Sequence, residues 1–158
     1  SSGTGKVLSV VCTNTTSQAT TGTVEEVLAV CVVPASTLAT NGQLLRLSVF
    51  VITAANTNSK NLKVRIGGSG SGTGGTTIST HTTAANGASI FVNVVLIRTA
   101  SNVQYSHSDG WSGTAAPGTS QATLALTDTS IIDLTITGTT ATAIGDLTFK
   151  GATTTIAN

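Results

Sequence analysis

The sequence predicts an all-β protein, built as an antiparallel sandwich, jelly roll or barrel, and three observations lead to this fold class. Charged helix formers are scarce while Val, Ile and Thr abound, so local preference favours strands. Several segments alternate apolar and polar residues with a period of two, which is typical of strands with one buried face. Gly, Pro and Asn-Gly turn signals punctuate the chain. Together these features predict about eight to ten short strands.

Two segments show the alternation most clearly. LLRLSVFV (residues 44–51) places aliphatic side chains on one face and Arg46, Ser48 and Phe50 on the other. NLKVRI (residues 61–66) repeats the pattern with its two basic residues on the polar face. Both segments are expected to be half-buried antiparallel strands.

Two further strands are expected later in the chain. SIIDLTIT (residues 130–137) should direct its Ile and Leu side chains inward and Asp133 and Thr135 outward. ASIFVNVVLIRT (residues 88–99) is apolar on both faces, as expected for a central strand or for one covered by a neighbouring subunit.

Length and charge limit the organisation and the partners. At 158 residues the chain is predicted to form a single domain over residues 1–158, with residues 1–6 as a flexible N-terminal arm. Only 8% of the residues are charged and the formal net charge is +1, which argues against nucleic acid as a partner. No window of ~18 apolar residues predicts a membrane span. A nearly neutral surface suits a subunit of a larger assembly.

The two cysteines, Cys12 and Cys31, each lie inside an apolar, strand-like run. Buried free thiols are the expected state, because a sandwich of this length needs no covalent staple. A disulfide between neighbouring strands remains open at this stage, since it depends on the cellular compartment and on geometry.

The glycine-rich stretch GGSGSGTGG (residues 67–75) satisfies the dinucleotide fingerprint G-x-G-x-x-G. The fingerprint also requires a helix that begins at the loop and an acidic residue about 20 positions later. Here TTISTHTT (residues 76–83) follows, which is poor helix material, and the next acidic residue is the distant Asp109. We therefore predict a flexible connection between two strands and no nucleotide cofactor.

Candidate catalytic and metal-binding residues are few. SHSDGW (residues 106–111) contains the residue types of a Ser-His-Asp triad, but neighbours on one strand or turn do not converge as a triad, and Asp-Gly predicts a solvated turn. His81, His107 and Asp109 lack the spacing of a metal site. The adjacent Glu25–Glu26 carboxylates should point to opposite faces of a strand. We predict no catalytic residue, no metal and no enzymatic activity.

The segment from Val24 to Gly68 contains four consecutive patterns: T-x-E-E-x-L, beginning one residue before it, then V-P-A-x-x-L-x-x-x-G, A-N-x-N-x-K and L-x-V-R-I-G-G. In these patterns the chain resembles a jelly-roll domain of structural proteins from tailed bacteriophages, and residues 127–156 look similar in kind. The matching positions are Glu25, Glu26, Pro34, Ala35, Leu38, Gly42, Asn56, Asn58, Lys60, Arg65 and Gly67. The resemblance implies a jelly-roll-like β-sandwich in a virion protein, and it supplies no catalytic residues.

The polar turn within this segment can also be interpreted directly. The side chains of Asn56 and Asn58 are suited to bond their own backbone in a turn. Lys60 is then expected at the solvent edge of the following strand.

The function predicted from the resemblance is a non-enzymatic bacteriophage virion protein, a capsid decoration or cement subunit that binds coat protein and forms a homo-oligomer, with a trimer expected. The alternative is a fibre or tail module that recognises host-surface glycan. A shortage of titratable groups disfavours a hydrolase, and the Thr-x-Thr runs lack the fixed period that ice binding needs. The predicted contact residues are Ser1, Ser2, Gly3, Thr4, Gly5, Lys6, Phe50, Phe91, Tyr105, His107, Asp109 and Trp111.

Overall fold

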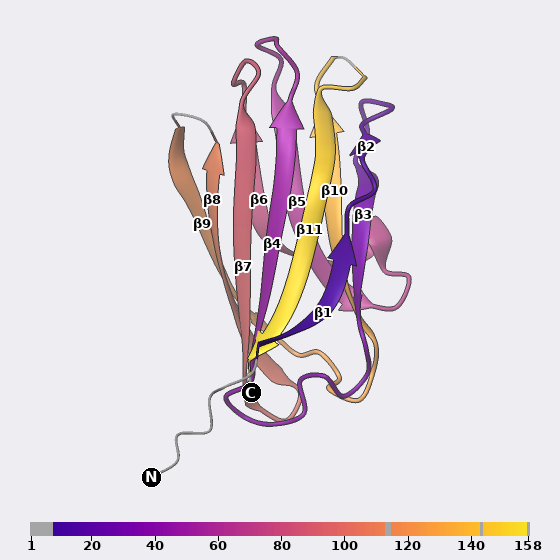
Figure 1. Ribbon diagram of the computed structural model, residues 1–158, viewed down its shortest axis with the longest axis vertical. Coiled ribbons are helices and arrows are strands. Elements are labelled where there is room, and N and C mark those ends of the chain that lie inside the picture. The colour runs from indigo at the N-terminus through magenta and orange to yellow at the C-terminus, as the bar shows by residue number, and fades with distance from the viewer. Residues whose placement is uncertain (1–7, 113–114, 143, 158) are drawn as a thin grey trace.

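The computed structural model describes residues 8–112, 115–142 and 144–157, with side chains left undescribed over 112–119. Two antiparallel sheets pack on each other as a sandwich (Figure 1). The predicted all-β sandwich is therefore confirmed. The predicted arm, residues 1–6, lies outside the described residues.

Eleven strands and one short 3-10 helix occur in the described residues. In spatial order, the larger sheet contains β1 (Leu8–Asn14), β11 (Leu147–Ala157), β4 (Leu44–Thr53), β7 (Ser89–Ala100), β8 (Val103–Ser112) and β9 (Ala115–Leu124), and the short β2 (Gln18–Ala19) also pairs with β11. The smaller sheet contains β3 (Glu26–Val33), β10 (Ile132–Thr140), β5 (Lys60–Gly68) and β6 (Thr76–Thr83). The helix η1 (Gly72–Gly74) lies between β5 and β6.

The chain crosses repeatedly between the two sheets. The larger sheet takes β1, β4, β7 and β11, while the smaller sheet takes β3, β5, β6 and β10. This is the connectivity of an eight-stranded jelly roll. The antiparallel pair β8–β9 is added beyond β7 and extends only the larger sheet (Figure 1).

Alternation along the strands builds an aliphatic core between the sheets. On β4 the residues Leu45, Leu47, Val49 and Val51 are fully buried, as the sequence predicts. On β10 the outcome differs, because Asp133 and Thr135 are buried as well as their inward-facing neighbours. Asp133 Oδ2 accepts a hydrogen bond of 2.7 Å from Gly70 N, in the glycine-rich connection. That stretch joins the antiparallel neighbours β5 and β6, so the predicted connection between two strands is confirmed.

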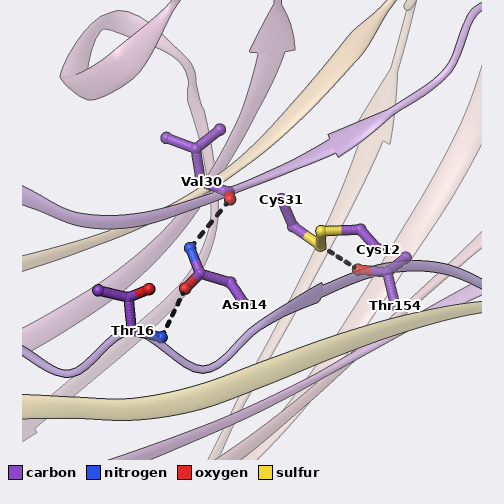
Figure 2. Close-up of a disulfide and its surroundings, with 6 residues drawn as sticks. All are labelled: Cys12, Asn14, Thr16, Val30, Cys31 and Thr154. Atoms are coloured by element: carbon purple, nitrogen blue, oxygen red, sulfur yellow. Dashed lines mark hydrogen bonds between the residues drawn. A yellow bond between two sulfur atoms is a disulfide. The ribbon is translucent and has the colours of Figure 1, made fainter.

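A disulfide joins Cys12 on β1 to Cys31 on β3, with the two Cα atoms 5.7 Å apart (Figure 2). The expectation of free thiols is therefore wrong. Because β1 and β3 are edge strands on the same side of the sandwich, their side chains meet between the sheets. Asn14 Nδ2 also donates to Val30 O across the same gap, at 3.4 Å. One covalent bond thus ties the edges of the two sheets together.

Lys60 is fully buried, which corrects its predicted place at the solvent edge. Its Nζ donates to Asn56 Oδ1 and Asn58 O, each at 2.9 Å, and more weakly to Ala85 O at 3.4 Å. Asp146 accepts hydrogen bonds from the Asn56 and Asn58 side chains at 2.6 and 3.0 Å, and these bonds together with the Lys60 charge lower the pKa of Asp146 despite its burial. The polar turn is formed as predicted, since Asn58 N donates to Asn56 Oδ1.

A second buried network lies at the opposite end of the strands. Arg98, near the end of β7, forms a 2.8 Å ion pair with Asp128. Asp128 also accepts bonds of 2.8 Å from Asn102 N and from Gln104 Nε2. Because Asn102 precedes β8 and Gln104 lies on it, this network fixes the start of the added β8–β9 pair.

Candidate binding face of the larger sheet

Three aromatic side chains lie in register on the outer face of the larger sheet. Phe50 on β4 is paired with Phe91 on β7, and Phe91 is paired with Trp111 on β8. They are 40%, 42% and 55% exposed, respectively. Since adjacent strands are about 4.8 Å apart, the three side chains form one apolar strip across the sheet, here called the aromatic row.

Further along the same face lies an open depression of 350 Å³, here called the sheet hollow. Its register rows are Val95–His107–Gln121 and Ile97–Tyr105–Thr123, across β7, β8 and β9. The complete lining is Val95, Ile97, Tyr105, Ser106, His107, Gln121, Ala122 and Thr123. Aliphatic side chains and the Tyr105 ring therefore lie beside hydrogen-bonding side chains.

A polar band separates the aromatic row from the sheet hollow. Ser48 Oγ is 2.8 Å from Asn93 Oδ1, on neighbouring strands. Asp109 Oδ1 is 3.1 Å from His107 Nε2, and both side chains are about half exposed. An exposed pair of this kind contributes little to stability.

The prediction of a solvated turn at residues 106–111 is wrong, because Asp109 and Gly110 lie within strand β8. Gly110 is buried, and a Cβ atom there would lie 1.7 Å from Cε1 of His81. The glycine is thus required because the His81 ring, from β6, packs against the β8 backbone. Burial lowers the pKa of His81, whose Nε2 is 2.9 Å from Ser79 Oγ.

Strand alternation also decides which candidate chemical groups meet. Ser106 and Ser108 are buried on the core side of β8, whereas His107 and Asp109 are exposed on its outer side. Neither serine therefore faces His107 as a triad would need. His81 lies under β8 and His107 lies above it, so the two imidazoles are on opposite sides of the sheet. No group of three metal-ligating side chains occurs among the described residues.

The structure brings together the predicted contact residues that it describes. Phe50, Phe91, Tyr105, His107, Asp109 and Trp111 all lie on this one outer face. Sequence reasoning missed Val95, Ile97 and Gln121. The two-sided apolar character of residues 88–99 was the available signal for Val95 and Ile97, whereas Gln121 had none.

The outer face of the smaller sheet has different electrostatics. Glu25 lies beside β5 and forms ion pairs with Arg65 at 2.6 Å and with Lys63 at 3.0 Å. Thr137 Oγ1 on β10 donates to the same carboxylate at 2.6 Å. The Arg65 hydrogen bond is the main reason that the pKa of Glu25 is lowered to about 2. The principal charges on this face are therefore already paired.

No protein-family model and no curated protein matches the sequence. Among solved structures, the chain aligns with infectious bursal disease virus structures of the Gt strain (15% identity, TM-score 0.35) and the Gx strain (10% identity, TM-score 0.40). These alignments cover 97% of this chain and 33% and 32% of the viral chains, so the chain spans about a third of their length. A Shewanella oneidensis protein of unknown function aligns over 95% of this chain and 78% of its own (9% identity, TM-score 0.29). Similarities at this level carry no functional conclusion.

Within the described ranges, no helix has the length and apolar character needed to cross a bilayer.

Proposed function

We propose that the protein is a non-enzymatic structural subunit of a bacteriophage virion, a decoration subunit that binds the coat-protein shell. The observation that carries this proposal is the aromatic row, Phe50, Phe91 and Trp111, exposed in register on one sheet face. The sequence resemblance to phage structural domains supplies the class of partner.

The aromatic row is suited to protein contact on physical grounds. Aromatic side chains bury about 150–250 Å² each and are enriched among the residues that dominate binding energy. The row lies on a regular strand framework, which is held by the disulfide and by two buried polar networks. A framework of this kind loses little conformational freedom when it binds.

Assembly as a homotrimer would strengthen each contact. If three copies bind a repeating lattice together, later contacts form at a high effective concentration, so individually weak contacts suffice. We propose the trimer on this basis and on the low net charge of the chain.

The test is co-sedimentation of the purified protein with capsids that lack it, together with its mass from light scattering. We expect saturable binding at a fixed copy number per capsid and a trimer mass in solution. Phe91→Ala should weaken co-sedimentation by about tenfold or more. Val32→Ala is the matched control, because Val32 is an exposed apolar residue on β3 of the other sheet. Absence of wild-type binding, or equal loss in both variants, would contradict the proposal.

A further inference from the structure

We infer that the sheet hollow is a binding site for a neutral carbohydrate. This inference goes beyond the proposed capsid contact and does not depend on it. It rests on residues of the sheet hollow and on the added β8–β9 pair, whereas the capsid contact rests on the aromatic row.

The size and lining of the sheet hollow are those of a small-ligand cleft. Ligand clefts occupy roughly 300–1,000 Å³ and combine apolar walls with a few polar groups that fix orientation. The sheet hollow has a volume of 350 Å³, with Val95 and Ile97 as its apolar side chains. Tyr105, half exposed, presents the ring of the chain's only tyrosine beside them.

The polar groups match the chemistry of a sugar ring, which has apolar C–H faces and hydroxyl groups at its rim. The Tyr105 ring offers a flat surface to a C–H face, and its hydroxyl can donate and accept hydrogen bonds. Gln121 and Thr123 supply an amide and a hydroxyl from β9, and His107 supplies an imidazole from β8. All of these side chains can bond hydroxyl groups without carrying a permanent charge.

The surrounding charges favour a neutral ligand. Outside the lining itself, the ionisable neighbours are Arg46, which is paired with Val95 on the next strand, and Asp109, whose Oδ1 is 3.1 Å from His107 Nε2. One cation and one anion give no excess of either sign, so a phosphate polymer gains little attraction. A lipid chain would leave the polar groups of Tyr105 and Gln121 without partners, which is costly.

The sheet hollow is separate from the aromatic row. His107 and Trp111 are four residues apart on β8, a distance of about 13 Å at 3.3 Å per residue. The polar band of Ser48, Asn93 and Asp109 lies between them. Variants in the sheet hollow and variants in the aromatic row can therefore be tested independently.

The two histidines of the chain allow sugar binding to be followed by NMR, with His107 in the sheet hollow and His81 in the core. We would titrate the full chain with maltohexaose, cellohexaose, chitohexaose, mannohexaose and laminarihexaose, and follow the imidazole and Tyr105 ring signals by NMR. We expect at least one sugar to shift the His107 and Tyr105 signals saturably. The buried His81 is the internal reference, and its signals should not move.

Variants then locate the binding. Tyr105→Ala and Gln121→Ala should weaken sugar binding by about tenfold or more, while Phe91→Ala leaves it unchanged. Thr82→Ala, at an exposed position on β6, is the control. The inference is overturned if no sugar shifts His107 at about 10 mM, a concentration that would reveal even millimolar affinity. It is also overturned if His107 shifts with protein concentration alone, because the hollow is then a contact between copies.

Discussion

The outer faces of the two sheets differ in their exposed groups: one face pairs its main charges, and the other exposes aromatic side chains. On the smaller sheet, Glu25 is held between Lys63, Arg65 and Thr137, so its charge already has partners within the chain. On the larger sheet, the aromatic row leaves apolar surface exposed. The comparison teaches that one sandwich can pair its main charges on one outer face and expose an aromatic strip on the other.

The added β8–β9 pair completes the aromatic row that Phe50 and Phe91 begin on framework strands. The eight framework strands form the jelly roll, and β8–β9 widens only the larger sheet. Tyr105, His107, Asp109 and Trp111 all lie on β8. Most of the candidate binding residues therefore belong to an addition to the framework, as expected when function is placed on a common fold.

The largest expected effect is a loss of capsid affinity when the aromatic row is truncated. The double variant Phe50→Ala/Phe91→Ala removes two neighbouring members of the aromatic row. We expect capsid affinity to fall by about a hundredfold or more, because aromatic hot spots each contribute about 2 kcal/mol or more. Thermal unfolding should change only slightly, since both rings are partly exposed. A large fall in the melting temperature would show that the row is structural.

Removing the disulfide between β1 and β3 tests whether this bond stabilises the sandwich without affecting the binding face. The variant Cys12→Ser/Cys31→Ser opens a loop with a sequence separation of 19 residues. We expect a loss of about 3 kcal/mol in unfolding free energy, measured by denaturant titration. Capsid affinity should stay near the wild-type value under conditions where the variant remains folded, because the aromatic row lies away from β1 and β3.

Gly110→Ala tests whether β8 packs directly against the His81 ring of β6. The new methyl group would overlap the His81 ring, so β8 or His81 must shift. We expect a loss of about 1–3 kcal/mol in unfolding free energy, the usual cost of overpacking a core. The companion variant Gly110→Ala/His81→Ala should recover part of this loss. Equal stability of Gly110→Ala and wild type would contradict the packing of His81 against β8.

Glu25→Gln tests how much the ion-paired carboxylate on the smaller sheet contributes to stability. The folded-state pKa of Glu25 is about 2, below the ordinary 4.5, so the carboxylate stabilises the fold at neutral pH. This contribution is present above pH 4.5 and is lost as the pH falls towards 2. We expect Glu25→Gln to cost about 1–2 kcal/mol at pH 7 and to flatten the acid dependence of unfolding between these values. Capsid binding should not change.

Arg46→Ala should have the smallest effect. Arg46 is an exposed residue on β4, on the face that contains the aromatic row. We expect the unfolding free energy of the Arg46→Ala variant to differ from that of wild type by no more than about 0.5 kcal/mol. A measurable change in the salt dependence of capsid binding would show that Arg46 contacts the partner, and would add a charge to the binding face.

The sequence predicted the parts of the fold that depend on local pattern. Alternation in residues 44–51 identified β4 and placed Phe50 outside the core, as the structure confirms. The Asp109-Gly110 turn was predicted wrongly, because the glycine accommodates His81 from a distant strand and does not reverse the chain. Lys60 was misplaced for a similar reason, since the loop containing Ala85 helps to bury it.

The arrangement of the candidate site depends on strand pairing, which local pattern does not specify. Phe50, Phe91 and Trp111 are far apart in the sequence, and only the registers of β4 with β7 and of β7 with β8 bring them into one row. Likewise, each cysteine looked like an ordinary core residue. Their pairing follows from the position of β1 and β3 at the same side of the sandwich.

The pairing of β1 with β11 determines how the fold would respond to a pulling force. Leu8 pairs with Ala157, so tension applied at these two residues would separate the strands one residue pair at a time. Along β1, the residues from Leu8 to Val11 would peel away before the tension reaches Cys12. From there part of the load passes through the covalent bond to Cys31, in the other sheet. Pulling β1 free of the fold would therefore also load the smaller sheet.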